Sequence, residues 1–220
     1  LKSVDFLKNL QMKNFKIPSG EITNLPYLLK IAKLRKKIIL SSGMANMKEI
    51  GATLKILTLN GTRKKDITIM QCNTEYPTPI KDANLKAMLS IGKKFQIDVG
   101  YSDHTEGIEA SLAAVALGAK IIEKHFTLNK NLPGPDHKAS ISGKELKNLV
   151  KGVRKISIAL GDGVKRVSPS EKKNINIARN SIVAAIDIKK GEKFSNKNLA
   201  IKRPGNGISP MKLFKVVGKI

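Results

Sequence analysis

The chain has 220 residues and a formal net charge of +24, from 41 basic and 17 acidic residues. Lysines are scattered along the predicted helices, and aromatic residues are only 4% of the chain, so we expect a basic field that attracts anionic substrates and no nucleic-acid partner. No apolar run approaches the roughly 18 residues of a membrane helix, and the single Cys72 is typical of a reducing cytosol, so we expect a cytoplasmic protein with no membrane partner.

Short strand-like runs alternate with longer segments of helical period along residues 1–160. Expected strands cover residues 15–17, 37–40, 66–71, 97–101 and 120–123. Expected helices cover residues 1–10, 24–33, 47–59, 82–94, 107–118 and 142–160. This alternation indicates parallel βαβ units. Five strands could form an open doubly wound sheet, but the glycine-rich phosphate fingerprint of such folds is absent. The pattern therefore favours a (β/α)8 TIM barrel that lacks its first three βα units.

The pattern changes after residue 160. Residues 161–177 are rich in Gly, Ser, Pro and polar residues and are predicted to be a linker. Residues 178–220 contain short strands and tight glycine turns but no long helix, which indicates a small β-rich module. We expect this module to be incomplete at its carboxyl end. The expected organisation is a partial barrel (strands 4–8) over residues 1–160, the linker, and a second domain over residues 178–220.

Each expected strand is followed by a polar cluster. Parallel strands joined by helices place these clusters at one edge of the sheet, where ligands bind in such folds. Hydroxyls, an amide and a lysine suit a phosphate group because each can donate a hydrogen bond to it. In chain order, the clusters are Lys16, Ser19 and Glu21; Ser41 and Ser42; Asn73 and Tyr76; Ser102, Asp103 and His104; and Glu123, Lys124 and His125.

Two histidines fall at the same place in successive strand–loop units. His104 follows the fourth expected strand and His125 the fifth. Lone histidines are often surface loop residues, and that interpretation stays open here. Two neutral imidazoles that converge at one sheet edge would instead form a divalent-metal site with open positions. Asp136 and His137 follow in a Gly–Pro loop that is long enough to reach the same edge.

Seven segments, in this order, resemble the bacterial sialic acid (N-acetylneuraminate) synthase family: KIPSGEITNLPYL, ILSSGMAN, CNTEYPTP, GYSDHT, IEKHFTL, GPDHKAS and KRPGNGISPM. The resemblance implies a (β/α)8 barrel followed by an antifreeze-like SAF domain. It implies a transferase that condenses phosphoenolpyruvate with N-acetylmannosamine and releases phosphate. It also implies a divalent cofactor, Mn²⁺ or a similar ion such as Mg²⁺ or Co²⁺, and a domain-swapped homodimer.

The resemblance also implies roles for individual residues. The expected metal ligands are His104 and His125. The expected phosphoenolpyruvate contacts are Lys16, Ser19, Ser41, Asn73 and Ser102, and Asn73 could exchange its role with Thr74.

Glu21 resembles the acidic group near the reacting carbons and is a candidate general acid/base, as is Asp136. The expected sugar contacts are Tyr76, Glu123, Asp136 and Arg203, the last reaching the N-acetyl group from the partner subunit.

Three alternatives remain open on the sequence. Legionaminic acid synthases, which use a related diacetamido sugar, share most of these segments, whereas pseudaminic acid synthases match GPDHKAS and RPGNG less well. The chain could also be a non-catalytic remnant or binding module. Because the three missing strands would bring further substrate-binding residues and leave strand edges exposed, we expect this polypeptide alone to be inactive or severely impaired.

Overall fold

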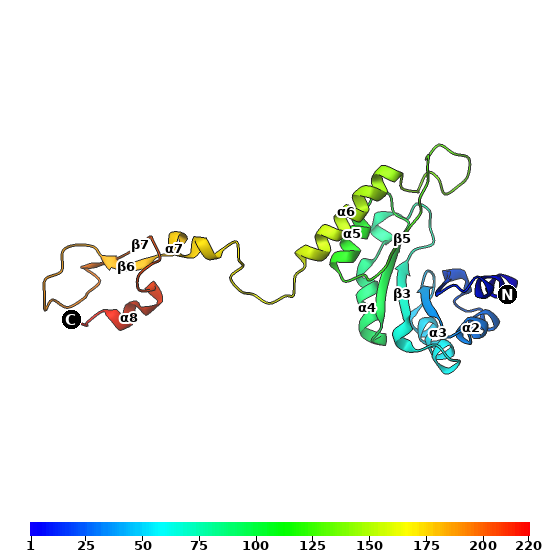
Figure 1. Ribbon diagram of the computed structural model, residues 1–220, viewed down its shortest axis with the longest axis horizontal. Helices are drawn as coiled ribbons and strands as arrows, with labels where there is room; N and C mark the ends of the chain where they lie inside the picture. Colours follow the sequence, from blue (N-terminus) through cyan, green and yellow to red (C-terminus); the bar gives the residue numbers. More distant parts are fainter. The chain divides into compact units, whose positions relative to one another are not determined.

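The computed structural model describes residues 1–220, which divide into two compact units, Leu1–Asp162 and Gly163–Ile220. In the first unit the expected strands form one parallel sheet in the order β1-β2-β3-β4-β5 (Figure 1). The strands are β1 Asn14–Ile17, β2 Lys37–Ser41, β3 Ile67–Cys72, β4 Asp98–Asp103 and β5 Ile122–Lys124. Every strand is hydrogen-bonded to the next one along the chain, so all five carboxyl ends lie at one edge.

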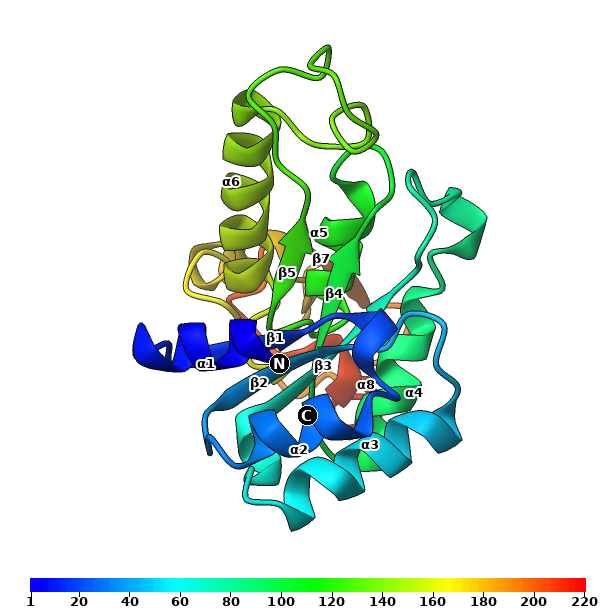
Figure 2. The same ribbon diagram turned by 90° about the vertical axis from the view of Figure 1, so that its right-hand side faces the viewer.

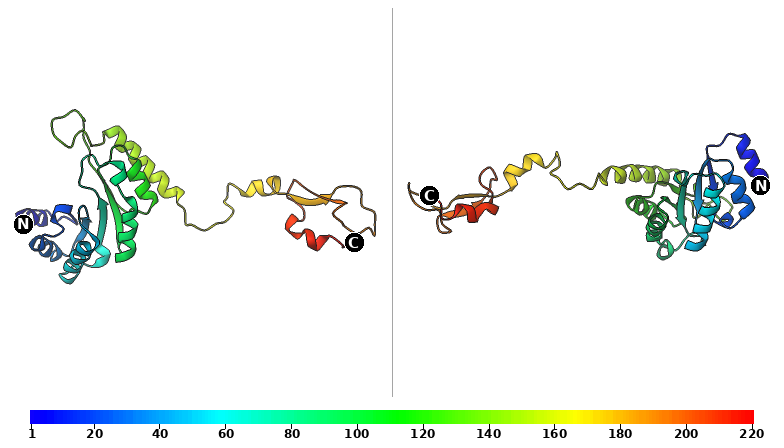
Figure 3. Two further views of the ribbon diagram at one scale, coloured as in Figure 1. Left: turned by 180° about the vertical axis from the view of Figure 1, so that it is seen from behind. Right: turned by 90° about the horizontal axis from the view of Figure 1, so that it is seen from below.

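Helices connect and cover these strands. They are α1 Lys2–Asn9, α2 Leu25–Ala32, α3 Met47–Leu59, α4 Leu85–Phe95, α5 Glu109–Ala116 and α6 Gly143–Ala159. In Figure 1, α4, α5 and α6 lie along one side of β3 and β5. The blue helix α1 lies beside α2 in both views of Figure 3. Asp5 of α1 pairs with Lys30 of α2.

The main core lies between the first strands and their helices. Strand residues Ile17, Leu40 and Ile69 are fully buried, and they form one cluster with Leu28 of α2 and Leu57 of α3. A second cluster joins Tyr101 of β4 to α4 and α5. Alternating apolar residues on the strands and one apolar face per helix account for both clusters.

The sheet is curved strongly enough for its first and last strands to meet through side chains. In a flat sheet, β1 and β5 would be four spacings, or roughly 19 Å, apart. A lysine and a glutamate side chain together extend only about 10 Å. Yet Lys16 of β1 lies 2.8 Å from Glu123 of β5. The five strands therefore form a strongly curved, half-barrel sheet. In Figure 2, β4 and β5 lie side by side, and β1 and β2 run obliquely to them.

Most element ends differ from the expected ones by one or two residues, and two of the differences have a clear physical cause. The helix expected from residue 82 begins at Leu85, because Ile80–Asp82 forms a separate 3-10 turn and Asn84 adopts a left-handed conformation with φ 43°. Strand β4 continues to Asp103 rather than ending at Tyr101, because its last residues pair with β5. Local hydrophobic pattern does not report this pairing.

The second unit contains an antiparallel pair, β6 Ser181–Ala184 and β7 Leu199–Lys202. Two short helices, α7 Ile175–Ala178 and α8 Leu213–Val216, precede and follow it. The Ser181 hydroxyl donates to the Pro204 carbonyl and accepts from the Gly207 N–H, which ties the glycine-rich turn to β6. In the whole chain, no helix combines the length and the apolar character needed to cross a membrane.

The first turn of α6 is stabilised by an ionised carboxylate. Ser142 and Glu145 form a capping box, in which each side chain bonds the other residue's backbone N–H. The Ser142 N–H, the Lys130 ammonium and the Ser142 hydroxyl, in that order, lower the pKa of Glu145 from 4.5 to about 2. A lowered pKa means that the carboxylate stabilises the fold above pH 4.5 and that this contribution is lost as the pH falls towards 2.

Glu145→Gln is therefore expected to lower the free energy of unfolding at neutral pH, with the difference from wild type shrinking between pH 4.5 and pH 2. Urea unfolding followed by circular dichroism across this range measures it. A difference that stays constant with pH would contradict the assignment.

Candidate functional site

Glu123 connects three strands at the carboxyl edge. Lys16 Nζ donates to its two carboxylate oxygens at 2.8 and 2.9 Å, and Ser102 Oγ donates to Oε1 at 2.7 Å. Burial raises the pKa of Glu123, but the hydrogen bonds from Lys16 and Ser102 outweigh burial and leave the pKa below 4.5. Glu123 is therefore ionised at neutral pH and balances the charge of Lys16.

Three aromatic rings meet beside this carboxylate. The ring centroids of His104 and His125 are 5.3 Å apart, and the two rings are nearly perpendicular at 89°. Tyr76 lies against both, with centroid distances of 4.1 Å to His104 and 5.3 Å to His125. These residues follow β3, β4 and β5, so three loops meet at the carboxyl edge of the sheet. The structure therefore places the two histidines side by side.

The hydrogen bonds of His104 define its tautomer. Its Nδ1 lies within hydrogen-bond distance of the Asn73 carbonyl, which can only accept, so Nδ1 carries the proton. Burial is the main cause that lowers the pKa of His104 below 6.5, so the ring is neutral at pH 7. The nearest partner of Nε2 is the Ser102 hydroxyl at 3.4 Å, and that hydroxyl already donates to Glu123. The lone pair of Nε2 is consequently available to a ligand.

This donor set fits a divalent metal ion. Metal-bound histidines commonly donate their second ring N–H to a carbonyl, as His104 does to Asn73. No group of three or more His, Cys, Asp and Glu side chains forms a metal cluster in the structure. A further carboxylate is close to the pair: Asp136 Oδ2 lies 3.7 Å from His125 Nδ1. Two imidazoles with open positions would leave room for water and substrate oxygens.

A second group of hydroxyl residues surrounds the ends of β1 and β2. Ser41 Oγ is buried beside the Cys72 thiol and makes no hydrogen bond of normal geometry. Ser19 lies directly against Gly43, where an added Cβ would come within 2.3 Å of the Ser19 Cβ and 3.3 Å of Thr74. The loops after β1, β2 and β3 thus converge. A buried hydroxyl without a partner is costly, which favours a ligand there.

Four other residues singled out from the sequence make no hydrogen bond with the histidine pair through their side chains. The Glu21 carboxylate accepts from Asn24 within its own turn, and no hydrogen bond or ion pair joins it to the histidines. The Asn73 side chain accepts from the Glu75 N–H, so its free group is the amide nitrogen. His137 bonds Thr127 rather than the histidine pair. Arg203 is exposed in the second unit, so its predicted reach to a sugar stays a prediction.

Two residues of the strand ends had no assigned role in the sequence. Asp103 and Lys124 form an ion pair of 2.9 Å with side-chain exposures of 0% and 3%. The available signal was their position, since opposite charges directly precede His104 and His125. That signal has meaning only once β4 and β5 are known to pair in register.

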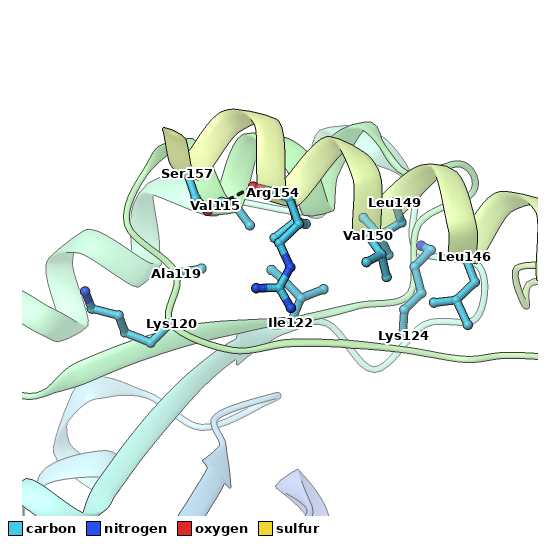
Figure 4. A pocket seen from close by; sticks show the side chains of 11 residues that line it. Val115, Ala119, Lys120, Ile122, Lys124, Leu146, Leu149, Val150, Arg154 and Ser157 are labelled. Atoms are coloured by element: carbon cyan, nitrogen blue, oxygen red, sulfur yellow. Dashed lines mark hydrogen bonds between the residues drawn. The ribbon is translucent and has the colours of Figure 1, made fainter. Parts of the chain in front are cut away.

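A hollow of about 380 Å³ lies between α5, α6 and β5, away from the histidines. Figure 4 shows Ile122 and Lys124 of β5 facing Leu146, Leu149 and Val150 of α6. Because successive strand residues point to opposite faces, Glu123 faces the other side of the sheet. The largely apolar hollow is therefore separate from the polar site.

Comparison with known proteins identifies the class. The NeuB family matches residues 1–165, and the SAF domain matches residues 179–220. The chain belongs to the NeuB family and carries a SAF domain, which confirms the resemblance to sialic acid synthases.

Among relatives, the chain is 62% identical over 220 residues to the N,N'-diacetyllegionaminic acid synthase of Campylobacter jejuni, covering 100% of this chain and 66% of that protein. It is 42% identical over 219 residues to the enzyme of the same name from Legionella pneumophila, covering 99% and 62%. The solved N-acetylneuraminic acid synthetase of Leptospira borgpetersenii gives a TM-score of 0.74 at 35% identity, covering 80% of this chain and 60% of that one. The chain thus spans less than two thirds of the length of these curated relatives.

Proposed function

We propose that this chain is part of a synthase that condenses phosphoenolpyruvate with an N-acetylated sugar, giving a nonulosonic acid and phosphate. The observation that carries the proposal is the histidine pair, 5.3 Å apart beside the Lys16–Glu123 ion pair, in a chain of the NeuB family. In this proposal the curved sheet is part of a (β/α)8 barrel, and the protein acts as a domain-swapped homodimer in which Arg203 contacts the sugar of the partner subunit.

The sugar that we propose is a diacetamido hexose. The 62% identity to the Campylobacter jejuni N,N'-diacetyllegionaminic acid synthase extends over the whole chain and supports this choice. N-acetylmannosamine is the alternative, supported by the 35% identity to the Leptospira sialic acid synthetase. Both sugars would use the same phosphoenolpyruvate and metal groups.

The phosphoenolpyruvate phosphate and carboxylate would be held by Lys16 together with Ser19, Ser41 and Ser102. The unpartnered Ser41 hydroxyl supplies a free donor, and Lys16 supplies the charge. Binding an anion there requires Lys16 to turn from Glu123, or to bridge it and the ligand. The Asn73 amide nitrogen or Thr74 would complete the group.

The reaction joins the enol carbon of phosphoenolpyruvate to the aldehyde carbon of the open-chain sugar. The C2 carbon then carries positive charge, water adds there, and C–O cleavage releases phosphate. The ionised Glu123 would stabilise that positive charge, and Glu21 or Asp136 would accept and return the protons of the added water. His104 and His125 would hold Mn²⁺, Mg²⁺ or Co²⁺, which when bound polarises the sugar carbonyl.

The test is phosphate release from phosphoenolpyruvate in the presence of Mn²⁺ and either sugar. We expect the rate with the diacetamido hexose to exceed that with N-acetylmannosamine. The ratio of the two rates is informative even when the absolute rate is low. A thermal-shift titration with phosphoenolpyruvate provides the binding readout.

Ser41→Ala is the matched variant for the phosphate group, because Ser41 Oγ makes no hydrogen bond of normal geometry in the structure. It should weaken phosphoenolpyruvate binding without lowering the melting temperature. Ser90→Ala, on the exposed face of α4, is the control. Absence of both phosphate release and a phosphoenolpyruvate-induced shift would refute the proposed function.

A further inference from the structure

A buried ion pair lies directly behind the two histidines. Asp103 is the last residue of β4 and Lys124 the last residue of β5, and the two are register partners in the parallel pairing. Their side chains lie on the helix side of the sheet, where Figure 4 shows Lys124 beneath α6. The preceding register partners, Ser102 and Glu123, bond each other on the opposite, polar side.

Every polar atom of this pair is engaged. Asp103 Oδ1 accepts from both the N–H and the hydroxyl of Thr105, at 2.9 and 2.7 Å. Asp103 Oδ2 accepts from Ser111 of α5 and from Lys124. Lys124 Nζ also donates to the Thr105 carbonyl at 2.7 Å. A buried charge pair is tolerated when its groups are satisfied in this way.

The Asp103–Lys124 ion pair holds the backbone on both sides of His104. Asp103 precedes it, and Thr105 follows it with its N–H, hydroxyl and carbonyl all held by the pair. The His104 carbonyl accepts from the Thr78 N–H, which holds the same peptide from the β3 side. Lys124 directly precedes His125, so the same ammonium links the segments that carry both rings.

We infer that Asp103 and Lys124 are positioning residues: their buried ion pair fixes the backbone of His104 and aligns the ends of β4 and β5, so that the two histidine rings face one ligand. The inference rests on the proposed function for its metal but concerns residues that touch neither metal nor substrate. A pair with only a structural role would change stability without changing ligand affinity.

The experiment compares Asp103→Asn with Leu28→Ala. Leu28 is fully buried on α2, in the core cluster that excludes Tyr101 and α5, so its loss destabilises the unit away from the strand ends. Mn²⁺ is titrated calorimetrically into each protein well below its melting temperature. Asp103→Asn is expected to weaken Mn²⁺ binding about 10-fold or more, the usual effect of losing a residue that orients a ligand. Leu28→Ala is expected to leave the affinity within about twofold of wild type, because it touches no orienting group.

The second readout needs no metal. The ¹⁵N shifts of the histidine rings report whether Nδ1 or Nε2 carries the proton. In metal-free wild type and Leu28→Ala we expect the Nδ1-protonated form of His104, and in Asp103→Asn a mixture of tautomers. If wild type binds no Mn²⁺, the metal part of the proposed function fails, and this readout alone decides the positioning role.

The double variant Asp103→Asn/Lys124→Gln covers the case in which Asp103→Asn does not fold, because it leaves no single buried charge. It should retain the fold and show the same loss of Mn²⁺ affinity and of tautomer preference. Ser111→Ala, which removes one donor to the carboxylate, should shift both readouts in the same direction by less. Wild-type affinity and an unchanged His104 tautomer in a folded pair variant would overturn the inference.

Discussion

His104→Ala is expected to weaken Mn²⁺ binding at least about 100-fold, more than the loss of a residue that only orients a ligand. The side chain is 8% exposed, its Nδ1–H is committed to Asn73, and its Nε2 lone pair is free beside His125. Removing it leaves one imidazole, and a single neutral ligand holds a divalent ion weakly. Calorimetric titration of Mn²⁺ gives the affinity, and phosphate release should fall with it.

The chain supplies a matched control, because it has one histidine outside the pair. His137 bonds Thr127, and His137→Ala should keep Mn²⁺ affinity close to wild type. His125→Ala should match His104→Ala, and the double variant should add little, since both rings would serve one ion. Equal affinities for His104→Ala and His137→Ala would eliminate the proposed metal site.

Gly100→Ala is expected to lower the free energy of unfolding by about 3 kcal/mol, at the upper end of overpacking effects. An added Cβ would lie 2.7 Å from the Ile121 carbonyl oxygen, which is backbone and cannot rotate away. That carbonyl accepts the Tyr101 N–H at 2.9 Å, so relief of the clash would separate β4 from the segment entering β5. Urea unfolding measures the loss.

Gly143→Ala is the control for this substitution. Its Cβ would meet nothing within 4 Å at the first position of α6, and alanine favours a helix, so stability should be unchanged or slightly raised. Because β5 carries Glu123 and leads to His125, Gly100→Ala should also weaken Mn²⁺ binding. A Gly100→Ala protein as stable as wild type would show that the two strands can separate at little cost.

Sequence reasoning was most successful where local signals determine structure. The alternation of strands and helices predicted parallel strands joined by helices, and β1 to β5 pair in this way. The proximity of His104 and His125 was predicted because each follows the end of a strand, and the two strands are successive. The sheet of the first unit is curved like half of a barrel, and its completion to a (β/α)8 barrel stays a prediction.

Contacts between residues far apart in the chain could not be predicted from the sequence. Nothing local indicates that Lys16 would meet Glu123, because they are 107 residues apart and the contact depends on the curvature of the whole sheet. The charges of Asp103 and Lys124 suggest surface residues until register places them opposite each other in the interior. Glu21 is predicted as an acid/base residue by resemblance, while its contact in the structure is with its own turn.

The Lys16–Glu123 contact also has a consequence for how the site assembles. The loops after β3, β4 and β5 carry Tyr76, His104 and His125. These three side chains can come together as soon as the three strands associate. Lys16 can reach Glu123 only after β1 and β2 have added to that sheet and the sheet has curved. The position of the Lys16 ammonium therefore depends on contacts between residues far apart in the sequence. Fraying of the β1 edge would leave the imidazoles together and remove the ammonium group, so the proposed binding of phosphoenolpyruvate would be lost before the proposed binding of a metal ion.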